Sequence, residues 1–289
     1  MGYKIITDST TDLTQKMIDE LELEVVSLRF TIDGKTYRDK ADQSEMPTKT
    51  FYAKLREGSS STTSQINADE FTSVFEPVLE SGEDVLYIAF SSGLSGTYQS
   101  ACIARDDLRE KYPERKIYVF DSLCASMGEG LLVYHAALMK RAGTDIDSLY
   151  KWLGENAPKL CHWFTVGDLN HLKRGGRIST TAALVGTMLG IKPVLHVDDE
   201  GHLIPVSKVR GRRQSLDALV QKMEETAIHP GEQTVFISHG DCLEDAEYVA
   251  EQVRAKFGVK NVQINFVGPV IGAHSGPGTV ALFFFGTHR

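Results

Sequence analysis

The chain has 289 residues, of which 42% are apolar and 24% charged, so it is long enough for two globular domains of ordinary composition. Its net charge of −8 argues against nucleic-acid binding, which needs a basic surface. No apolar run approaches the length of a membrane span, and the first residues predict a strand instead of a signal peptide.

The first half of the chain predicts strands that alternate with helices. This alternation favours a mainly parallel sheet covered by helices on both faces. Asp12 with Gln15 predicts one helix start, and Asn67 with Glu70 predicts a capping box at another. The expected elements are strands over 3–7, 85–90 and 117–120, a hairpin over 25–38, a polar loop over 59–65, and helices over 44–56, 71–79, 128–143, from 97 and from 145.

Three of the predicted strands end in polar pairs, Asp8-Ser9, Ser91-Ser92 and Asp121-Ser122. The carboxyl ends of parallel strands share one edge of a sheet, and ligands bind just outside that edge. The middle strand continues into Gly93-Leu94-Ser95-Gly96 and then a helix, whose free N–H groups and dipole favour an anion. We therefore expect a site for a small anionic group at this loop.

The second half of the sequence predicts a different fold class, because its hairpins and returning strands indicate an α+β domain. Its expected elements are strands over 161–166, 234–238, 262–267 and up to 285, a hairpin over 192–206, helices over 180–189, 242–257 and up to 227, a basic glycine-broken link over 167–179, and a glycine-rich loop over 268–278. The predicted fold class is α/β: an N-terminal domain (1–160) with a mainly parallel sheet flanked by helices, followed by a C-terminal α+β domain (161–289).

A serine hydrolase is one alternative function, with Ser95 as the nucleophile and His274 as the base. The sequence Gly93-Leu94-Ser95-Gly96-Thr97 lacks the final glycine of a nucleophile elbow, and no acid is obvious to complete a triad. The four cysteines are far apart and the histidines have no metal-ligand spacing. This spacing predicts a cytoplasmic protein with reduced cysteine thiols. We expect neither a bound metal nor a cofactor.

Five segments together resemble the DegV family of bacterial fatty-acid-binding proteins, also called FakB. They occur in the family's order and span nearly the whole chain: Asp8-Ser9-Thr10, Thr63-Ser64-Gln65, Ser91-Ser92-Gly93-Leu94-Ser95-Gly96-Thr97-Tyr98, Lys173-Arg174-Gly175-Gly176-Arg177-Ile178-Ser179, and Gly268-Pro269-Val270-Ile271 with Ala273, His274 and Gly276. Ile66 stands where the family usually has proline, which predicts a local change of the backbone.

The resemblance implies a DegV/EDD-like protein with a long-chain fatty acid, such as palmitate, bound between the two domains. Its tail would lie in an apolar tunnel, and its carboxylate would be hydrogen-bonded by Thr63 and Ser95 with His274 nearby. Ser92, Gly96 and Thr62 would form the supporting loops. A carrier of another amphiphilic anion remains the second alternative.

The family also implies a partner. Its members present the fatty acid to a separate ATP-dependent fatty acid kinase, which makes an acyl-phosphate for phospholipid synthesis. By the same resemblance, Arg177 and Arg210 would lie on the face that meets the kinase or the phosphate, and the protein itself would not be an enzyme. Five further apolar side chains fit two interpretations equally well, the lining of an apolar pocket or the core side of an ordinary helix: Leu184, Val185, Met188, Leu189 and Ile191.

Overall fold

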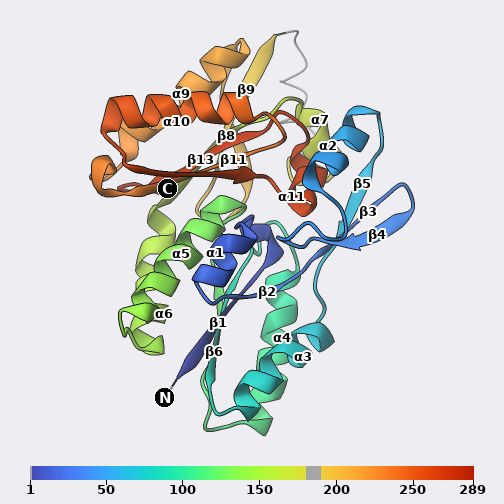
Figure 1. Cartoon of the computed structure of the whole chain (residues 1–289), viewed down its shortest axis with the longest axis vertical. Helices are drawn as coiled ribbons and strands as arrows, with labels where there is room; N and C mark the ends of the chain where they lie inside the picture. The colour runs from blue at the N-terminus through green and yellow to red at the C-terminus, as the bar shows by residue number, and fades with distance from the viewer. Residues whose placement is uncertain (1, 180–189) are drawn as a thin grey trace.

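Two large β-sheets organise the chain in this computed structural model, which describes residues 2–179 and 190–289 (Figure 1). The first is a parallel four-stranded sheet with the order β2-β1-β6-β7, as the alternation predicts. Successive residues of β1, Ile5 and Ile6, belong to hydrophobic clusters on opposite faces, so both faces are covered. Its strands are β1 (Tyr3–Asp8), β2 (Glu24–Val26), β6 (Asp84–Ala89) and β7 (Ile117–Asp121).

Helices cover both faces of the parallel sheet. Asn67 and Glu70 form the predicted capping box at the start of α3. Asp12 does not begin a helix, because the Thr14 side chain caps α1 instead. The helices of this half are α1 (Gln15–Glu20), α5 (Met127–Arg141) and α6 (Ile146–Asn156) on one face, with α3 (Ala68–Glu80) and α4 (Thr97–Lys111) on the opposite face.

A small antiparallel sheet, β4-β3-β5, extends from the first half and lies beside α2. The predicted polar loop over 59–65 is partly wrong, because Thr63 and its neighbours form β5 and pair with β3. The predicted strand 25–32 is divided between two sheets, whereas its hairpin is confirmed. The elements are β3 (Arg29–Ile32), β4 (Lys35–Arg38), β5 (Ser61–Ser64) and α2 (Thr48–Arg56).

The second half of the chain builds a mixed six-stranded sheet with the order β10-β9-β8-β13-β11-β12. Its outer face is covered by α9 (Arg212–Thr226) and α10 (Leu243–Phe257). All of its strands lie at or after residue 160, while the domain boundary there stays a prediction. The strands are β8 (Leu160–Thr165), β9 (Ile191–Val197), β10 (Leu203–Arg210), β11 (Thr234–His239), β12 (Asn261–Phe266) and β13 (Val280–Phe285).

Two segments predicted as irregular contain short helices, α7 (Leu169–Arg174) and α11 (Pro269–Ser275). Gly175 follows the end of α7, and Pro269 occupies the first position of α11, where its missing N–H costs nothing. The helix predicted over 180–189 lies outside the described residues. The described residues also form three short 3-10 helices: η1 (Ser9–Thr11), η2 (Ala157–Lys159) and η3 (Pro230–Glu232).

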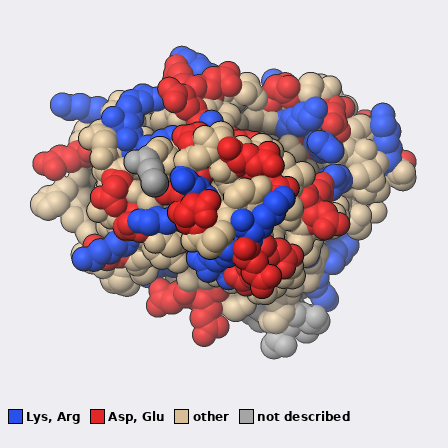
Figure 2. All heavy atoms as spheres, turned by 90° about the horizontal axis from the view of Figure 1, so that it is seen from below, with Lys and Arg blue, Asp and Glu red and all other residues tan. Residues whose placement is uncertain are grey.

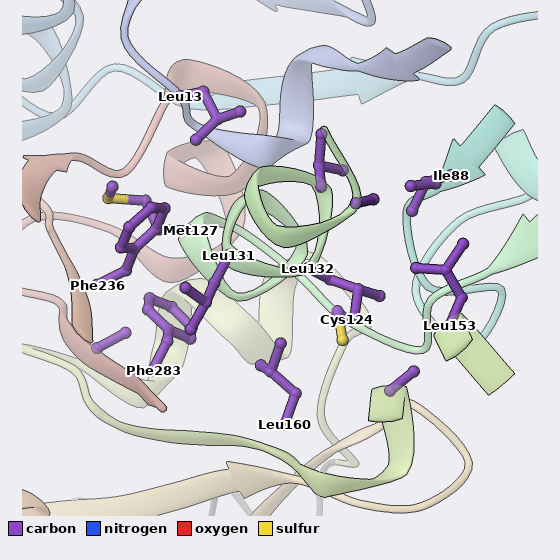
Figure 3. Packing of buried hydrophobic residues seen from close by; sticks show 14 of the residues in the cluster. Leu13, Ile88, Cys124, Met127, Leu131, Leu132, Leu153, Leu160, Phe236 and Phe283 are labelled. Carbon is purple, nitrogen blue, oxygen red and sulfur yellow. The ribbon is translucent and has the colours of Figure 1, made fainter. Parts of the chain in front are cut away.

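Helix α5 joins the two large sheets through one hydrophobic cluster (Figure 3). Met127 and Leu131, one helical turn apart, lie on the side of α5 that faces Phe236 and Phe283 of the mixed sheet. The same cluster contains Ile88 of the parallel sheet. Because α5 packs against both sheets, it fixes the position of one sheet relative to the other.

The surface at the bottom of Figure 1 carries acidic and basic side chains interspersed with one another (Figure 2). This face therefore offers no broad basic surface for a nucleic-acid backbone. Within residues 2–179 and 190–289, no helix has both the length and the apolar character that a membrane crossing requires. The same residues contain no group of three or more His, Cys, Asp or Glu side chains able to hold a metal ion.

Candidate functional site

A cavity of about 180 Å³ lies between the carboxyl-end loops of the parallel sheet and the face of the mixed sheet that packs on α5. Phe90 and Leu94 contribute from the loop after β6, while Phe164, Val197 and Phe283 contribute from β8, β9 and β13. Most of the wall is thus apolar. Such a wall suits a hydrocarbon chain, because burying apolar area is favourable.

Three predicted polar residues line this cavity: Thr63, Ser95 and His274. The Thr63 Oγ1 and His274 Nε2 atoms are 2.8 Å apart and form a hydrogen bond. Thr63 is supplied by β5 and His274 by the last turn of α11, so elements that are 211 residues apart in sequence meet here. The structure therefore brings Thr63 and His274 into contact and places Ser95 in the wall of the same cavity.

The loop that carries Ser95 is held by its own hydrogen bonds. The Ser95 N–H donates to the Ser91 carbonyl at 3.1 Å, and the Thr97 N–H donates to Ser95 Oγ at 3.3 Å. Ser95 Oγ also lies 2.9 Å from the Thr97 hydroxyl. Gly96 precedes α4 without a side-chain cap, so other N–H groups of the first turn are available to an anion.

Arg177 fixes this loop from the other half of the chain. Its Nε and Nη2 atoms donate to the Leu94 carbonyl at 3.2 and 3.1 Å, next to Ser95. Burial, together with the nearby Arg177 charge, lowers the pKa of His274 to about 4. The imidazole is therefore neutral at neutral pH, and the positive charge at this end of the cavity belongs to Arg177.

Glycine allows the His274 ring to reach its position. A Cβ atom on Gly175 would lie 2.1 Å from His274 Nδ1, far inside van der Waals contact. Within the described part of the chain, that Nδ1 atom is buried without a hydrogen-bond partner. A Cβ on Gly96 would likewise lie 2.2 Å from Gln65 Oε1. The two glycines thus permit the loops to close around the polar end of the cavity.

A second, more polar cavity of about 310 Å³ adjoins the first. Thr63, Arg177 and His274 line both cavities, so the two meet at these side chains. The remaining wall is rich in hydroxyl and basic groups, including Ser59, Ser60, Ser61, Thr62, His171 and Arg174. A group bound at Thr63 and His274 is therefore accessible from a polar side as well as from the apolar one.

The other predicted residues are more dispersed. Gly96 lines the first cavity and Thr62 the second. Ser92 lines neither cavity; its side chain is exposed and its N–H donates to Asp121 Oδ1 at 3.1 Å. Arg210 is exposed at the end of β10 and also lines neither cavity.

Of the apolar residues that fit the lining of a pocket, Leu184, Val185, Met188 and Leu189 lie outside the described residues. Ile191 is described, at the start of β9, but is not part of the cavity wall.

A buried acidic network was not predicted from the sequence. Asp12 Oδ1 accepts the Gly268 N–H at 3.0 Å, and Asp39 Oδ2 accepts the Val270 N–H at 3.2 Å, so both carboxyls hold the start of α11. Burial raises the pKa of Asp12 well above its usual range and that of Asp39 to about 7. These contacts join residues that are more than 200 positions apart, which no local pattern could show.

The geometry does not assemble a nucleophile and base. His274 Nε2 is hydrogen-bonded to Thr63, while Ser95 Oγ is hydrogen-bonded to Thr97. Within the described residues, no carboxylate contacts His274 Nδ1 to orient the ring. The arrangement therefore suits binding better than acyl transfer, which needs a base held against the serine.

Comparison with known proteins gives consistent matches over almost the whole chain. Residues 3–287 match the model of a family described as uncharacterised proteins of the DegV family. A DegV domain-containing protein of Clostridium perfringens is 50% identical over 284 residues, which cover 98% of this chain and 97% of the relative.

Two solved structures show how similar the folds are. A structure described as fatty acid binding of a DegV family protein from Thermus thermophilus has a TM-score of 0.87 at 29% identity, covering 99% of this chain and 100% of the other. A stearic acid-binding protein from Eubacterium ventriosum has a TM-score of 0.86 at 26% identity, covering 97% of each chain.

Proposed function

This chain belongs to the DegV family, and from that premise we propose that it binds a long-chain fatty acid in the cavity between its two large sheets. The observation that carries the proposal is a largely apolar cavity whose wall also contains Thr63, Ser95 and His274. The hydroxyl groups of Thr63 and Ser95 can donate hydrogen bonds to a carboxylate, and Arg177 supplies a positive charge close to His274. A fatty-acid carrier fits this site better than a serine hydrolase, while a carrier of another amphiphilic anion stays the alternative; a cytoplasmic location is part of the proposal.

The tail should supply most of the affinity and the head group the orientation. Each buried methylene contributes about 0.8 kcal/mol, so about fifteen give roughly 12 kcal/mol before the costs of ordering. A hydrogen bond to a carboxylate adds a net of roughly 1.5–3 kcal/mol. The direct test is mass spectrometry of lipid extracted from the purified protein, together with titration of delipidated protein with stearate. Absence of fatty acid in both would overturn the proposal.

Thr63→Ala and Ser95→Ala should each weaken stearate binding about tenfold or more without abolishing it, because each removes one hydrogen bond to the carboxylate. Displacement of a fluorescent fatty acid measures this change. Thr36→Ala, which removes a threonine on strand β4 at the other edge of the same small sheet, is the matched control and should bind as the wild type does. Unchanged affinity in both site variants would contradict the assignment of the head-group end.

Presentation of the fatty acid to a separate ATP-dependent kinase is the finer part of the proposal. The kinase would transfer a phosphoryl group to the carboxylate and release ADP. Support comes from the second cavity, which reaches Thr63, Arg177 and His274 from its polar side. Arginine suits such a face, since its planar fork can bind a carboxylate or a phosphate in a bidentate way.

Arg210→Ala should keep its bound fatty acid but slow acyl-phosphate formation when the host's fatty acid kinase and ATP are supplied. An exposed arginine at a protein–protein rim mainly sets the association rate and its salt dependence, so added salt should slow the wild type more than the variant. Acyl-phosphate formation is measured with radiolabelled fatty acid. Loss of bound lipid without a specific kinase defect would assign Arg210 to the structure of the pocket instead.

Ser95 should not react with a fluorophosphonate, because its hydroxyl is hydrogen-bonded to Thr97 and not to a histidine. Mass spectrometry of the treated protein should show no adduct on Ser95. Hydrolysis of p-nitrophenyl esters should be no faster than with Ser95→Ala. A covalent adduct would favour the serine hydrolase alternative.

A further inference from the structure

Besides the residues assigned to the head group, four further hydroxyl side chains interrupt the apolar wall of the first cavity. Ser126, Ser238, Ser275 and Thr279 all line this cavity, and we call them the hydroxyl strip. Each is at most 5% exposed. Buried hydroxyls are costly unless they are hydrogen-bonded, so their partners indicate what the strip is built to contact.

The strip contains hydroxyls with unused hydrogen-bonding capacity. Within the described residues, Ser275 Oγ is buried without any partner. Ser238 Oγ lies 2.9 Å from Ser126 Oγ, and Ser126 Oγ also hydrogen-bonds Asp12 Oδ2. Ser126 has a single hydroxyl hydrogen, which it can donate to only one of these two neighbours. If Ser126 donates to Ser238, the Ser238 hydrogen is free to donate to a ligand. If Ser238 donates to Ser126 instead, the Ser238 oxygen is free to accept from a ligand.

The backbone at Ser126 shows that this arrangement is maintained against strain. Ser126 has φ 55° and ψ −148°, a conformation that residues other than glycine rarely adopt. Asp12, itself hydrogen-bonded to Gly268, holds the Ser126 side chain from another part of the fold. Burial favours the neutral form of Asp12, which then donates to Ser126 and leaves the Ser238 hydrogen as the free donor.

We propose that the hydroxyl strip binds a hydroxyl group on the hydrocarbon chain of the ligand, so that the protein accepts monohydroxy fatty acids as well as plain ones. The proposal rests on the proposed function, because it needs the tail to lie in this cavity. A neutral hydroxyl can accept from Ser238 and donate to a neighbouring oxygen.

The test titrates delipidated protein with stearate, with positional isomers of monohydroxystearate and with the matching ketostearates. At least one hydroxy isomer should bind about tenfold tighter than stearate, the factor that corresponds to one net hydrogen bond. The ketostearate with its oxygen on the same carbon should bind less tightly than that isomer, because a ketone accepts hydrogen bonds but cannot donate one.

Ser238→Ala should remove the preference for the hydroxy isomer, measured as the ratio of its affinity to that of stearate for the same variant. Ser275→Ala is the second variant and should lower the same ratio. Ser215→Ala, a buried serine of α9 outside the cavity, is the control and should keep the preference. If stearate binds and every hydroxy isomer binds more weakly, the strip is overturned and the carrier function stands. If neither stearate nor any isomer binds, both are overturned.

Discussion

Gly175→Ala should weaken the binding of stearate by about ten- to a hundredfold, although it adds a single methyl group. The new Cβ would lie 2.1 Å from His274 Nδ1, so the ring must leave its hydrogen bond with Thr63. Losing hydrogen bonds to a carboxylate costs roughly 1.5–3 kcal/mol each, which corresponds to this range. Octadecanol, which has the same tail and no charge, should lose much less affinity than stearate.

The neighbouring glycine provides the control. Gly175 has φ −73° and ψ −8°, which alanine adopts without strain, so the effect of Gly175→Ala isolates the contact with the ring. Gly176 has φ +69° and nothing within 4 Å of an added Cβ. Gly176→Ala should therefore cost about 1 kcal/mol of stability and leave stearate affinity unchanged. Equal effects of the two substitutions would argue against a role for His274 in binding.

Leu131→Ala should lower the free energy of unfolding by about 2–5 kcal/mol, the usual range for removing a fully buried leucine. Leu131 is 0% exposed and belongs to the cluster through which α5 packs against the mixed sheet. Alanine is an excellent helix former, so the loss would come from packing and not from helix propensity. Urea denaturation followed by circular dichroism measures the change.

Leu138→Ala makes the same chemical change on the same helix at a position that is 37% exposed. Its effect should stay below about 1 kcal/mol, since less apolar surface returns to water on unfolding. If the two substitutions cost the same, α5 does not hold the two sheets together through its buried side.

Much of the parallel half could be predicted because its information is local. The polar strand ends do share one edge: Ala89 pairs with Asp121, and Asp8 Oδ2 accepts the Phe90 N–H at 3.1 Å. However, Asp8 and Asp121 hold the intervening loop, whose Ser92 N–H donates to Asp121. The sequence therefore located the carboxyl-end edge of the parallel sheet correctly. That Asp8 and Asp121 hold the backbone of the loop after β6 depends on contacts between distant segments, which only the folded chain reveals.

Other parts of the site have no local signal. Strand β5 consists of Ser61, Thr62, Thr63 and Ser64, so its sequence has no apolar alternation that would indicate a strand. The segment is extended because it pairs with β3. Helix α11 has seven residues, too few to be stable alone, and the buried Asp12 and Asp39 hold its start. The position of His274 thus depends on carboxyl groups more than 200 residues away.

The place of β13 in the mixed sheet has a consequence for the order in which the protein can fold during synthesis. This strand lies between β8 and β11, yet it follows both of them in the chain. While the ribosome still holds Val280–Phe285, the sheet is divided into two separate parts with facing unpaired edges. The parallel sheet, whose strands all precede residue 122, is free of this delay. We therefore expect the first half to fold on the ribosome and the cavity to close only late, with the exposed edges of β8 and β11 as the point where a nascent chain is most prone to aggregate.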